Sequence, residues 1–295
     1  MASRAKQYYV FVNVSLEVVW RTSPAFSCIA PIRVPLPGTL MAAGVRGRAF
    51  VIGYFKKQIP LRRQSGGDDL FSHLCRAAYE DGSFLSAQDI ADHMSFFIMA
   101  AYDTLTSSLT SLIYRLAAHP QWQVAVREEL TGQGAGLGRP LSYEGLEMLP
   151  LTEMAFKEAM RMAPPVPSMP RRALRDFEFK GIAIPAHALV NINPLYTHHM
   201  PEHWPDPERF DPMRFSEEAS RLRHRYAFVP FGGGAHMCLG LNFAYMQAKC
   251  FAWHFFSRFK VSIREGYQPA WRMWPIPRPR DGLRVTLTPL AAERA

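Results

Sequence analysis

The sequence predicts a single, mainly helical domain with a small β part, an α+β fold over residues 1–295. Three observations support this expectation. Apolar residues recur at helical spacing from Gly44 to about Arg63 and from Ser86 to Pro120. From Pro164 onward prolines cluster, and short β-like runs such as FEFKGIAIP and ALVNINP appear. Apolar residues make up 48% of the chain and charged residues 20%, which is enough for a packed core.

Charge and cysteine content exclude several classes of protein. The net charge is +9, but the basic residues occur as scattered pairs such as Lys56-Lys57 and Arg62-Arg63. This distribution favours a solvated surface and no nucleic acid partner. The four cysteines form no C-x-x-C pair and no secretory signal is visible, so we expect reduced thiols. The apolar segment YYVFVNVSLEVVW is interrupted by Asn13 and Glu17 and is too short for a membrane helix.

The first half of the chain is predicted to be helical. The first seventy residues are expected to form helices broken by PIRVPLPG, and LFSHLCRAAYEDG is expected to form another. The longest helix begins at Ser86, which forms a capping-box pattern with Asp89, and ends at Pro120. Its middle is apolar nearly all round, so we expect it to be buried at the centre of the molecule. PQWQVAVREEL and LEMLPLTEMAFKEAMRM are predicted to be the next helices.

The second half is predicted to be more irregular. After the β-like runs, HHMPEHWPDPERFDPMRF is rich in proline and must pack through side chains rather than through regular backbone hydrogen bonds. A helix is expected from Leu239 to about Phe259, and a single strand in PIPRPRDGLRVTLTPL closes the chain.

Two groups of polar residues could have a structural or chemical role. Glu158 and Arg161 are neighbours on one helix face, and Arg209 could join them to hold the proline-rich segment; the alternative is an ordinary surface ion pair. Asp103 and Thr104 lie in the long apolar helix, where an acid is costly unless it is paired or functional. The alternative here is a solvated acid beside a threonine of no special role.

The segment FGGGAHMCLG carries the clearest chemical signal. Its three consecutive glycines permit positive φ angles and close backbone approach before Cys238. The following helix N-terminus favours a thiolate, which suits an axial metal ligand. One alternative is a small buried hydrophobe. Another is a zinc site that recruits His236 and Cys250, but the spacing fits no usual zinc pattern. No Gly-Lys-Ser/Thr follows, so a phosphate-binding loop is excluded.

Together these motifs resemble those of the cytochromes P450. FGGGAHMCLG matches that family's haem-binding loop, Phe-x-x-Gly-x-x-x-Cys-x-Gly, and EAMR matches its Glu-x-x-Arg helix. PERFDPMRF is similar to its Pro-Glu-Arg-Phe segment, and AAYDT to the oxygen-activating stretch of its central helix. Ala101 and Leu105 depart from this stretch, which commonly has glycine and a hydroxyl residue there. The four motifs occur in the family's order, from about Pro35 to Leu290.

The resemblance implies a haem b site. Cys238 would be the thiolate ligand of the iron, and Phe231 would pack beside its sulfur. Asp103 and Thr104 would deliver protons for dioxygen activation, while Glu158, Arg161 and Arg209 would form a buried structural triad. His236 and Arg171, with Arg172 as its rival, would bind the haem propionates. The remaining residues expected at the cofactor are Ala100, Gly232, Gly234 and Gly240.

The resemblance also implies a function and an incomplete fold. It predicts a haem-thiolate monooxygenase that hydroxylates a lipophilic molecule such as a sterol, terpenoid or fatty acid. No flavin or nicotinamide motif is visible, so a separate ferredoxin or flavoprotein reductase would supply the electrons. Intact members have a long N-terminal part, which we do not find, so we expect the C-terminal two-thirds of the fold. The alternative is a truncated, non-catalytic relative that acts as a haem-binding or interaction module.

Two further expectations concern surfaces. The basic cluster Arg221, Arg223, His224 and Arg225 could dock an acidic electron donor, or could be a solvated loop. Substrate contacts are expected from Phe97–Ala101, Pro165–Met169 and Met273–Ile276, although core packing is an equal alternative for these apolar residues. A cytoplasmic location is expected.

Overall fold

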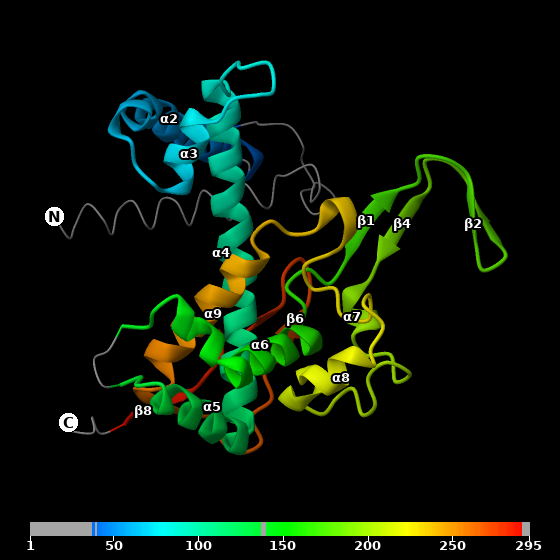
Figure 1. The fold of residues 1–295 in the computed structure, drawn as a ribbon. Coiled ribbons are helices and arrows are strands. Elements are labelled where there is room, and N and C mark those ends of the chain that lie inside the picture. Colours follow the sequence, from blue (N-terminus) through cyan, green and yellow to red (C-terminus); the bar gives the residue numbers. More distant parts are fainter. Residues whose placement is uncertain (1–36, 39, 137–139, 291–295) are drawn as a thin grey trace. The chain divides into compact units, whose positions relative to one another are not determined.

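The computed structural model describes residues 37–38, 40–136 and 140–290 (Figure 1). The chain divides into two compact units, Met1–Tyr102 and Asp103–Ala295, and each is considered by itself. Helix α4 (Ala87–Ala118) begins in the first unit and ends in the second. The sequence prediction of a single domain stays a prediction. Expectations for the N-terminal helices before α2 and for Cys28 lie outside the described residues.

The first unit is helical. Helix α2 (Leu40–Ser65) covers the predicted segment, and α3 (Leu70–Arg76) is capped by Asp69, which accepts a hydrogen bond from the backbone N–H of Ser72. Helix α3 is shorter than predicted because the backbone turns extended at Ala77, and a bridge between Ala78 and Phe84 follows. The core of this unit comprises Val51, Ile52, Phe55, Ile59, Phe71, Cys75, Ile90 and Ala91.

Helix α4 confirms the predicted start but not the predicted burial. The Ser86 hydroxyl accepts from the N–H of Asp89 and donates to its carboxylate, and the helix ends one residue before His119. As expected, the helix does not continue through Pro120: His119 before it is non-helical, and Pro120 itself is the first residue of the next helix. Its second half is buried around Leu112 and Leu116, whereas its middle is half-exposed, with Phe96 56% exposed. The apolar pattern predicts that other parts of the protein pack on α4 all round, but among the described residues such packing buries only part of the helix.

The length and apolar composition of α4 raise the question of a membrane span. Among the described residues, α4 is long and apolar enough to cross a membrane by length and composition. That is weak evidence, because the core helix of a soluble protein meets the same test.

The second unit packs helices around one apolar core. Its helices are the second half of α4, α5 (Pro120–Gly132), the 3-10 helix η2 (Glu144–Met148), α6 (Pro150–Met162) and α9 (Leu241–Phe255). Helix α9 is shorter than predicted because strand β5 begins at Phe259. The most completely buried core residues are Leu116, Leu130, Leu149, Ala155, Ala159, Ala252 and Phe256.

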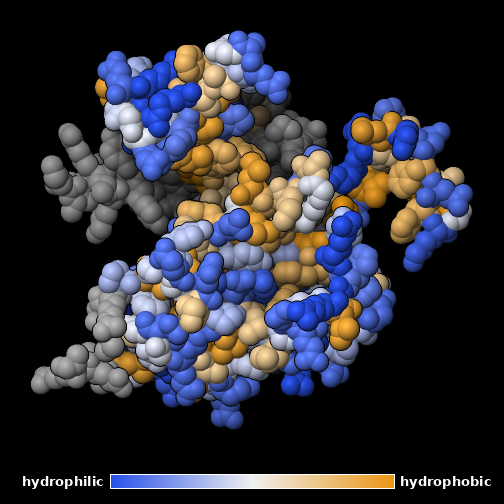
Figure 2. All heavy atoms as spheres, in the orientation of Figure 1, coloured by the Kyte–Doolittle hydropathy of each residue, from blue (hydrophilic) through white to orange (hydrophobic). Residues whose placement is uncertain are grey.

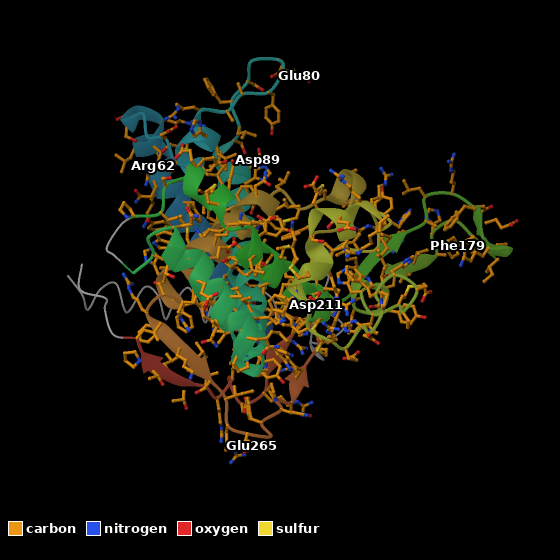
Figure 3. All side chains as sticks on the ribbon, turned by 60° about the horizontal axis from the view of Figure 1, so that its bottom comes forward. Arg62, Glu80, Asp89, Phe179, Asp211 and Glu265 are labelled. Atoms are coloured by element: carbon orange, nitrogen blue, oxygen red, sulfur yellow. The ribbon has the colours of Figure 1, made fainter. Side chains whose placement is uncertain are left out.

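The β part consists of two-stranded antiparallel sheets. These pair β1 (Met169–Arg172) with β4 (Leu189–Ile192), β2 (Phe177–Phe179) with β3 (Ile182–Ile184), β5 (Phe259–Ser262) with β8 (Thr286–Pro289), and β6 (Trp271–Arg272) with β7 (Arg278–Pro279). The predicted β-like runs became β2, β3 and β4; β1, β5, β6 and β7 were not predicted. The β2–β3 hairpin extends away from the helices of its unit, with Phe179 near its end and apolar side chains on its surface (Figures 2 and 3).

The proline-rich segment packs through side chains, as expected. It contains the short 3-10 helix η3 (Pro212–Phe215) and is flanked by two short helices, α7 (Pro194–Thr197) before it and α8 (Glu217–Arg221) after it. Trp204 and Phe210 are nevertheless fully buried. Trp204 packs against Phe215 and Phe228, with ring centroids 5.7 and 6.3 Å apart. A small second core of Trp204, Phe215 and Ala227, with Phe228 packed against it, therefore joins this segment to the residues just before Phe231.

Candidate functional site

The segment Phe231–Gly240, here called the cysteine loop, is a compact turn before helix α9. The backbone N–H of Cys238 donates to the carbonyl of Phe231 at 2.9 Å, which closes the loop. Inside it, Gly234–His236 forms a single turn of 3-10 helix, η4. Gly232 and Gly234 have φ angles of +73° and +61°, in the left-handed region that favours glycine. These glycines therefore make the closed conformation accessible.

Close approach adds a second reason for glycine. A Cβ on Gly232 would lie 3.2 Å from the carbonyl oxygen of His236, inside the loop. A Cβ on Gly240 would lie 3.7 Å from the Cys238 sulfur, which is ordinary van der Waals contact. Gly240 is also the N-cap residue of α9. The thiol therefore stands beside an unobstructed backbone and just before a helix N-terminus, where the dipole favours negative charge.

The donor set fits a haem with a single thiolate ligand. Cys238 is exposed, and so are the neighbouring apolar side chains of Met237 (52%), Leu239 (90%) and Phe243 (52%). A sulfur donor surrounded by accessible apolar side chains suits a flat, apolar cofactor. Across the described part of the chain, no three His, Cys, Asp or Glu side chains gather as metal ligands would. The zinc alternative, which requires His236 and Cys250 near Cys238, therefore gains no support.

Aromatic packing supports the start of the loop. The ring of Phe231 packs edge-on against Tyr245 of α9, with centroids 5.4 Å apart. Tyr245 in turn contacts Phe156 of α6 at 6.1 Å and carries the ammonium of Lys157 5.3 Å over its ring. Burial raises the pKa of the Tyr245 phenol, with the nearby Glu153 as a smaller cause. The phenol is therefore a neutral packing group that fixes Phe231.

The two residues expected to bind propionates lie in the same unit as the loop. Strand β1 passes close to it, since a Cβ on Gly232 would lie 3.8 Å from the sulfur of Met169. On this strand Arg171 is half-buried and donates to the carbonyl of Pro170 at 2.9 Å, whereas Arg172 is exposed. His236 is exposed in η4. Their contacts with a propionate stay predictions.

Asp103 and Thr104 lie half-buried on α4, in the second unit. The backbone carbonyl of Thr104 accepts a hydrogen bond from the hydroxyl of Ser108 at 2.9 Å. Such a side-chain bond to the preceding turn is one way in which hydroxyl residues modify a helix. Ala100 is half-buried and belongs to the first unit. The proton-delivery and cofactor roles of these residues stay predictions.

Glu158 and Arg161 form a fully buried ion pair. The guanidinium donates to both carboxylate oxygens, from Nε at 2.7 Å and Nη2 at 2.9 Å, and both side chains are 0% exposed. Arg161 also donates to the carbonyls of His198 at 2.8 Å and Pro207 at 2.7 Å. Desolvation raises the pKa of the Glu158 carboxyl, and the Arg161 guanidinium and the N–H of Asp211 counteract part of that increase. The sequence alternative of a surface pair is wrong.

The expected third member, Arg209, does not join this pair. Its side chain is 68% exposed and lies 3.5 Å from the carboxylate of Asp211; only its backbone carbonyl accepts, at 3.4 Å, from Arg161. Arg214 takes the expected place, with its Nε 3.4 Å from Glu158 and only 12% of its side chain exposed. That Nε has no partner of good hydrogen-bond geometry, so the contact is electrostatic.

Sequence reasoning missed Arg214 although a signal was present. The chain contains the pattern Pro-x-Arg-Phe twice, at 207–210 and 212–215. The first copy has a glutamate at its second position, Glu208, as the family's segment does, whereas the second copy has Met213 there. The backbone turn at Asp211, whose N–H donates to Glu158 at 3.0 Å, brings the second copy to the carboxylate.

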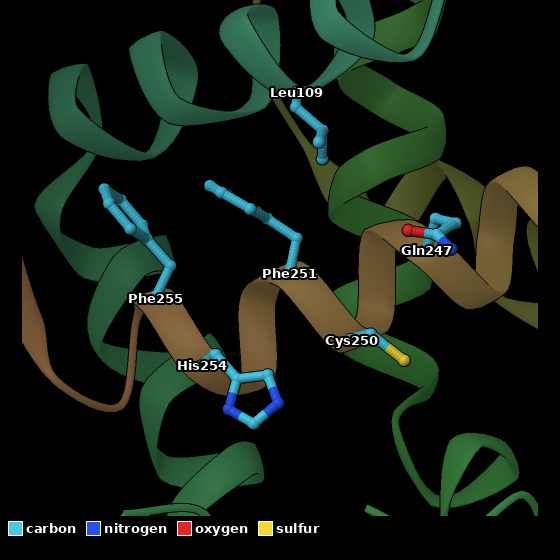
Figure 4. Close-up of a pocket in the computed structure, with 6 residues that line it drawn as sticks. All are labelled: Leu109, Gln247, Cys250, Phe251, His254 and Phe255. Carbon is cyan, nitrogen blue, oxygen red and sulfur yellow. The ribbon is translucent and has the colours of Figure 1, made fainter. Parts of the chain in front are cut away.

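One open groove of the second unit lies away from the predicted site. It has a volume of about 420 Å³ and is lined by Leu109, Gln247, Cys250, Phe251, His254 and Phe255 (Figure 4). Phe251 and Phe255 stack at 4.9 Å and point towards α4, whereas His254 and Cys250 project to the opposite side of α9. None of the predicted site residues lines this open groove, so we assign the candidate site to the cysteine loop on its donor chemistry.

Comparison with known proteins identifies a family for the chain. The family model described as cytochrome P450 matches residues 2–282. The chain is 38% identical over 280 residues to cytochrome P450 136 of Mycobacterium tuberculosis, covering 92% of this chain and 56% of that protein. It is 34% identical over 257 residues to cytochrome P450 120 of Synechocystis sp., covering 86% and 57%. It thus spans just over half the length of these curated relatives.

Solved structures agree. The structure titled "Retinoic acid bound cyanobacterial CYP120A1" matches with a TM-score of 0.82 and 29% identity, over 95% of this chain and 69% of that one. The haem domain of cytochrome P450DA matches with a TM-score of 0.79 at 23% identity, over 94% and 59%, which supports the fold alone. The predicted fold class, mainly α with a small β part and P450-like, is therefore confirmed. The chain belongs to the cytochrome P450 family.

Proposed function

We propose that this chain carries the haem-thiolate site of a monooxygenase that hydroxylates a lipophilic small molecule. The observation that carries the proposal is the exposed Cys238 thiol on a glycine-rich turn before α9. When bound, a haem b would supply the dioxygen-activating chemistry of the family. The chain spans just over half the length of its curated relatives, so we propose the monooxygenase activity for the protein rather than taking it over from them.

Different residues of the chain would bind the cofactor and deliver protons. Cys238 would hold the cofactor through its thiolate, and Phe231 would pack beside that sulfur. Arg171 and His236 would anchor the propionates by charge-assisted hydrogen bonds. Asp103 and Thr104 would hold and move protons at the carboxylate and the hydroxyl.

The proposed substrate is apolar, of the sterol, terpenoid or fatty-acid kind. Apolar side chains at the expected contact positions support this, including Met273 and Trp274, the latter 43% exposed. The names of two relatives give further support. One structure holds retinoic acid, and a protein of Sus scrofa that is 36% identical over 182 residues is named taurochenodeoxycholic 6 alpha-hydroxylase.

Electrons are proposed to come from a ferredoxin or a flavoprotein reductase that docks on exposed basic residues. Arg223 is unsuited to this role, because its guanidinium lies 4.0 Å over the ring of Trp204 and donates to the carbonyl of Arg214. Arg221, which also pairs with Glu217, and Arg225 remain exposed. Charge reversal of Arg225 should slow reduction in a salt-dependent way, and an unchanged rate would remove the docking idea.

The carbon monoxide difference spectrum of the dithionite-reduced, haem-loaded protein tests the proposal. A strongly red-shifted Soret band that is absent in Cys238→Ala supports the thiolate site. Cys250→Ala is the matched control, because Cys250 lies in α9 beside the separate groove, and it should keep the band. A wild-type chain that takes up no haem favours the alternative, a non-catalytic relative that serves as a binding module.

Thr104 can be tested in the same preparation. Thr104→Ala should divert electrons from product to hydrogen peroxide, because proton delivery is impaired. Thr106→Ala, on the same helix but exposed, is the control. Coupling that stays at the wild-type level in Thr104→Ala would argue against the proton-delivery role. A cytoplasmic location is part of the proposal, and cell fractionation tests it.

A further inference from the structure

His198 connects the buried ion pair to the cysteine loop. It follows α7, and its side chain is 0% exposed. Its backbone carbonyl accepts from Nη1 of Arg161 at 2.8 Å, and its ring nitrogen Nε2 accepts from the backbone N–H of Val229 at 2.9 Å. One residue therefore contacts both the Glu158–Arg161 pair and the segment that enters the loop.

From Val229 the connection continues through the backbone. The carbonyl of Val229 accepts from the N–H of Gly232 at 3.1 Å, and the carbonyl of Phe231 accepts from the N–H of Cys238 at 2.9 Å. Pro230 between them is buried and has a fixed φ angle, so a shift at Val229 is passed on to Phe231. Two backbone hydrogen bonds and the rigid Pro230 therefore link the Cys238 backbone to Val229, which is bonded to His198.

The ring of His198 has little freedom to move. It packs against Phe228 with centroids 5.2 Å apart and against Trp204 at 6.5 Å. A backbone N–H can only donate, so Nε2 must be the unprotonated nitrogen and Nδ1 carries the proton. Nδ1 is buried without a partner of good hydrogen-bond geometry among the described residues, and the backbone of Arg161 and Met160 lies beside the ring, so the bond to Val229 is the one well-formed hydrogen bond that sets the tautomer.

We propose that His198 is a positioning residue that holds the cysteine loop in register with the buried Glu158–Arg161 pair, and thereby sets the position of the Cys238 thiol. The ring supplies a fixed acceptor, and Arg161 fixes the backbone that carries the ring. The inference depends on the proposed function only where haem is the readout, because the hydrogen bonds involve protein atoms alone.

Amide hydrogen exchange of the intact chain tests the link directly. His198→Phe keeps an aromatic ring but removes the acceptor, and exchange at the Val229 and Cys238 amides should rise about tenfold or more, as expected for the loss of one buried hydrogen bond. His199→Phe is the matched control. His199 contacts the carbonyl of Leu195 and lies 3.9 Å from Glu208, so its replacement should leave loop exchange unchanged.

Two polar variants separate positioning from general destabilisation. The side-chain amide of His198→Gln reaches the place of Nε2 and can accept from Val229, so it should restore exchange to within about threefold of wild type. The shorter side chain of His198→Asn cannot reach and should behave like His198→Phe. Equal exchange in the Gln and Asn variants, or a uniform increase over all amides of the second unit, overturns the proposal.

A spectroscopic readout extends the test to the cofactor. In the haem-loaded chain, His198→Phe and His198→Asn should lower the red-shifted share of the carbon monoxide band, and His198→Gln should restore it. If wild type binds no haem, the proposed function fails while amide exchange still decides the role of His198. If haem binds and all three variants keep the wild-type spectrum and loop exchange, the positioning role is wrong.

Discussion

The Glu158–Arg161 ion pair and the cysteine loop lie in the same unit of the protein but differ in their exposure to solvent. Glu158 and Arg161 are 0% exposed and make several short hydrogen bonds to side chains and carbonyls. The loop exposes Cys238 and most of its neighbours and is closed by backbone hydrogen bonds. The candidate ligand Cys238 is thus accessible on a loop held by backbone hydrogen bonds, whereas the ion pair, which has no proposed chemical role, is fully enclosed.

The largest effect on the free energy of unfolding is expected from breaking the Glu158–Arg161 ion pair. Glu158→Ala leaves the Arg161 guanidinium buried without its carboxylate, which should cost about 3–5 kcal/mol of unfolding free energy. Urea unfolding followed by tryptophan fluorescence measures it. A loss below about 1 kcal/mol would show that the pair does not stabilise the second unit.

The two Pro-x-Arg-Phe arginines provide a matched comparison. Arg214→Ala removes a nearly buried cation 3.4 Å from Glu158 and a hydrogen bond to the carbonyl of Asp206, and should cost roughly 2–3 kcal/mol. Arg209→Ala removes an exposed side chain and should leave the urea midpoint unchanged. The opposite ranking would restore Arg209 as the third member of the cluster.

Acid should weaken the connection between the two regions. Burial lowers the pKa of His198 to about 3; the Arg161 guanidinium acts in the same direction, and the backbone of Arg161 and Met160 counteracts part of the decrease. Between that value and the ordinary pKa near 6.5, the unfolded chain binds a proton that the folded chain does not, so stability falls as pH falls below about 6.5. Wild type should lose about 2 kcal/mol more than His198→Gln between pH 7 and pH 5. Parallel pH curves for the two proteins in urea titrations would contradict this assignment.

Smaller effects are expected in the loop. Gly232→Ala forces a side chain into a positive φ and places its Cβ 3.2 Å from the His236 carbonyl, at a cost of roughly 1–2 kcal/mol. Gly234→Ala has the same kind of φ but open space around its Cβ, so it should cost less. Comparing their thermal midpoints isolates the close approach, and equal midpoints would show that backbone strain alone matters.

The smallest effect on stability is expected at the reactive residue itself. Cys238→Ala should leave the unfolding midpoint unchanged, because the thiol is exposed, although it should abolish the thiolate spectrum of the haem-loaded protein. Calorimetry of the haem-free chain measures the first quantity. A clear drop in the midpoint would mean that the loop depends on its sulfur for packing.

Local signals predicted much of the helical outline and the positive φ angles of the loop. The capping pattern at Ser86 marked the start of α4, and glycines before a lone cysteine marked the site, because caps and positive φ angles are properties of short segments. Strand β1 escaped prediction because Met169–Arg172 contains a proline and pairs with the distant β4. Strand pairing depends on the partner as much as on the strand.

The sequence by itself determined the family, the mainly helical fold and the identity of the candidate ligand, since those depend on residue types at fixed spacing. Only the tertiary structure decided that Arg214 rather than Arg209 faces Glu158, and that His198 connects Arg161 to Val229. Arg209 and Arg214 occupy the same place in two copies of Pro-x-Arg-Phe, and the backbone turn at Asp211 decides which of them faces Glu158. That turn is fixed by a buried carboxylate far away in the sequence, which spacing alone does not report.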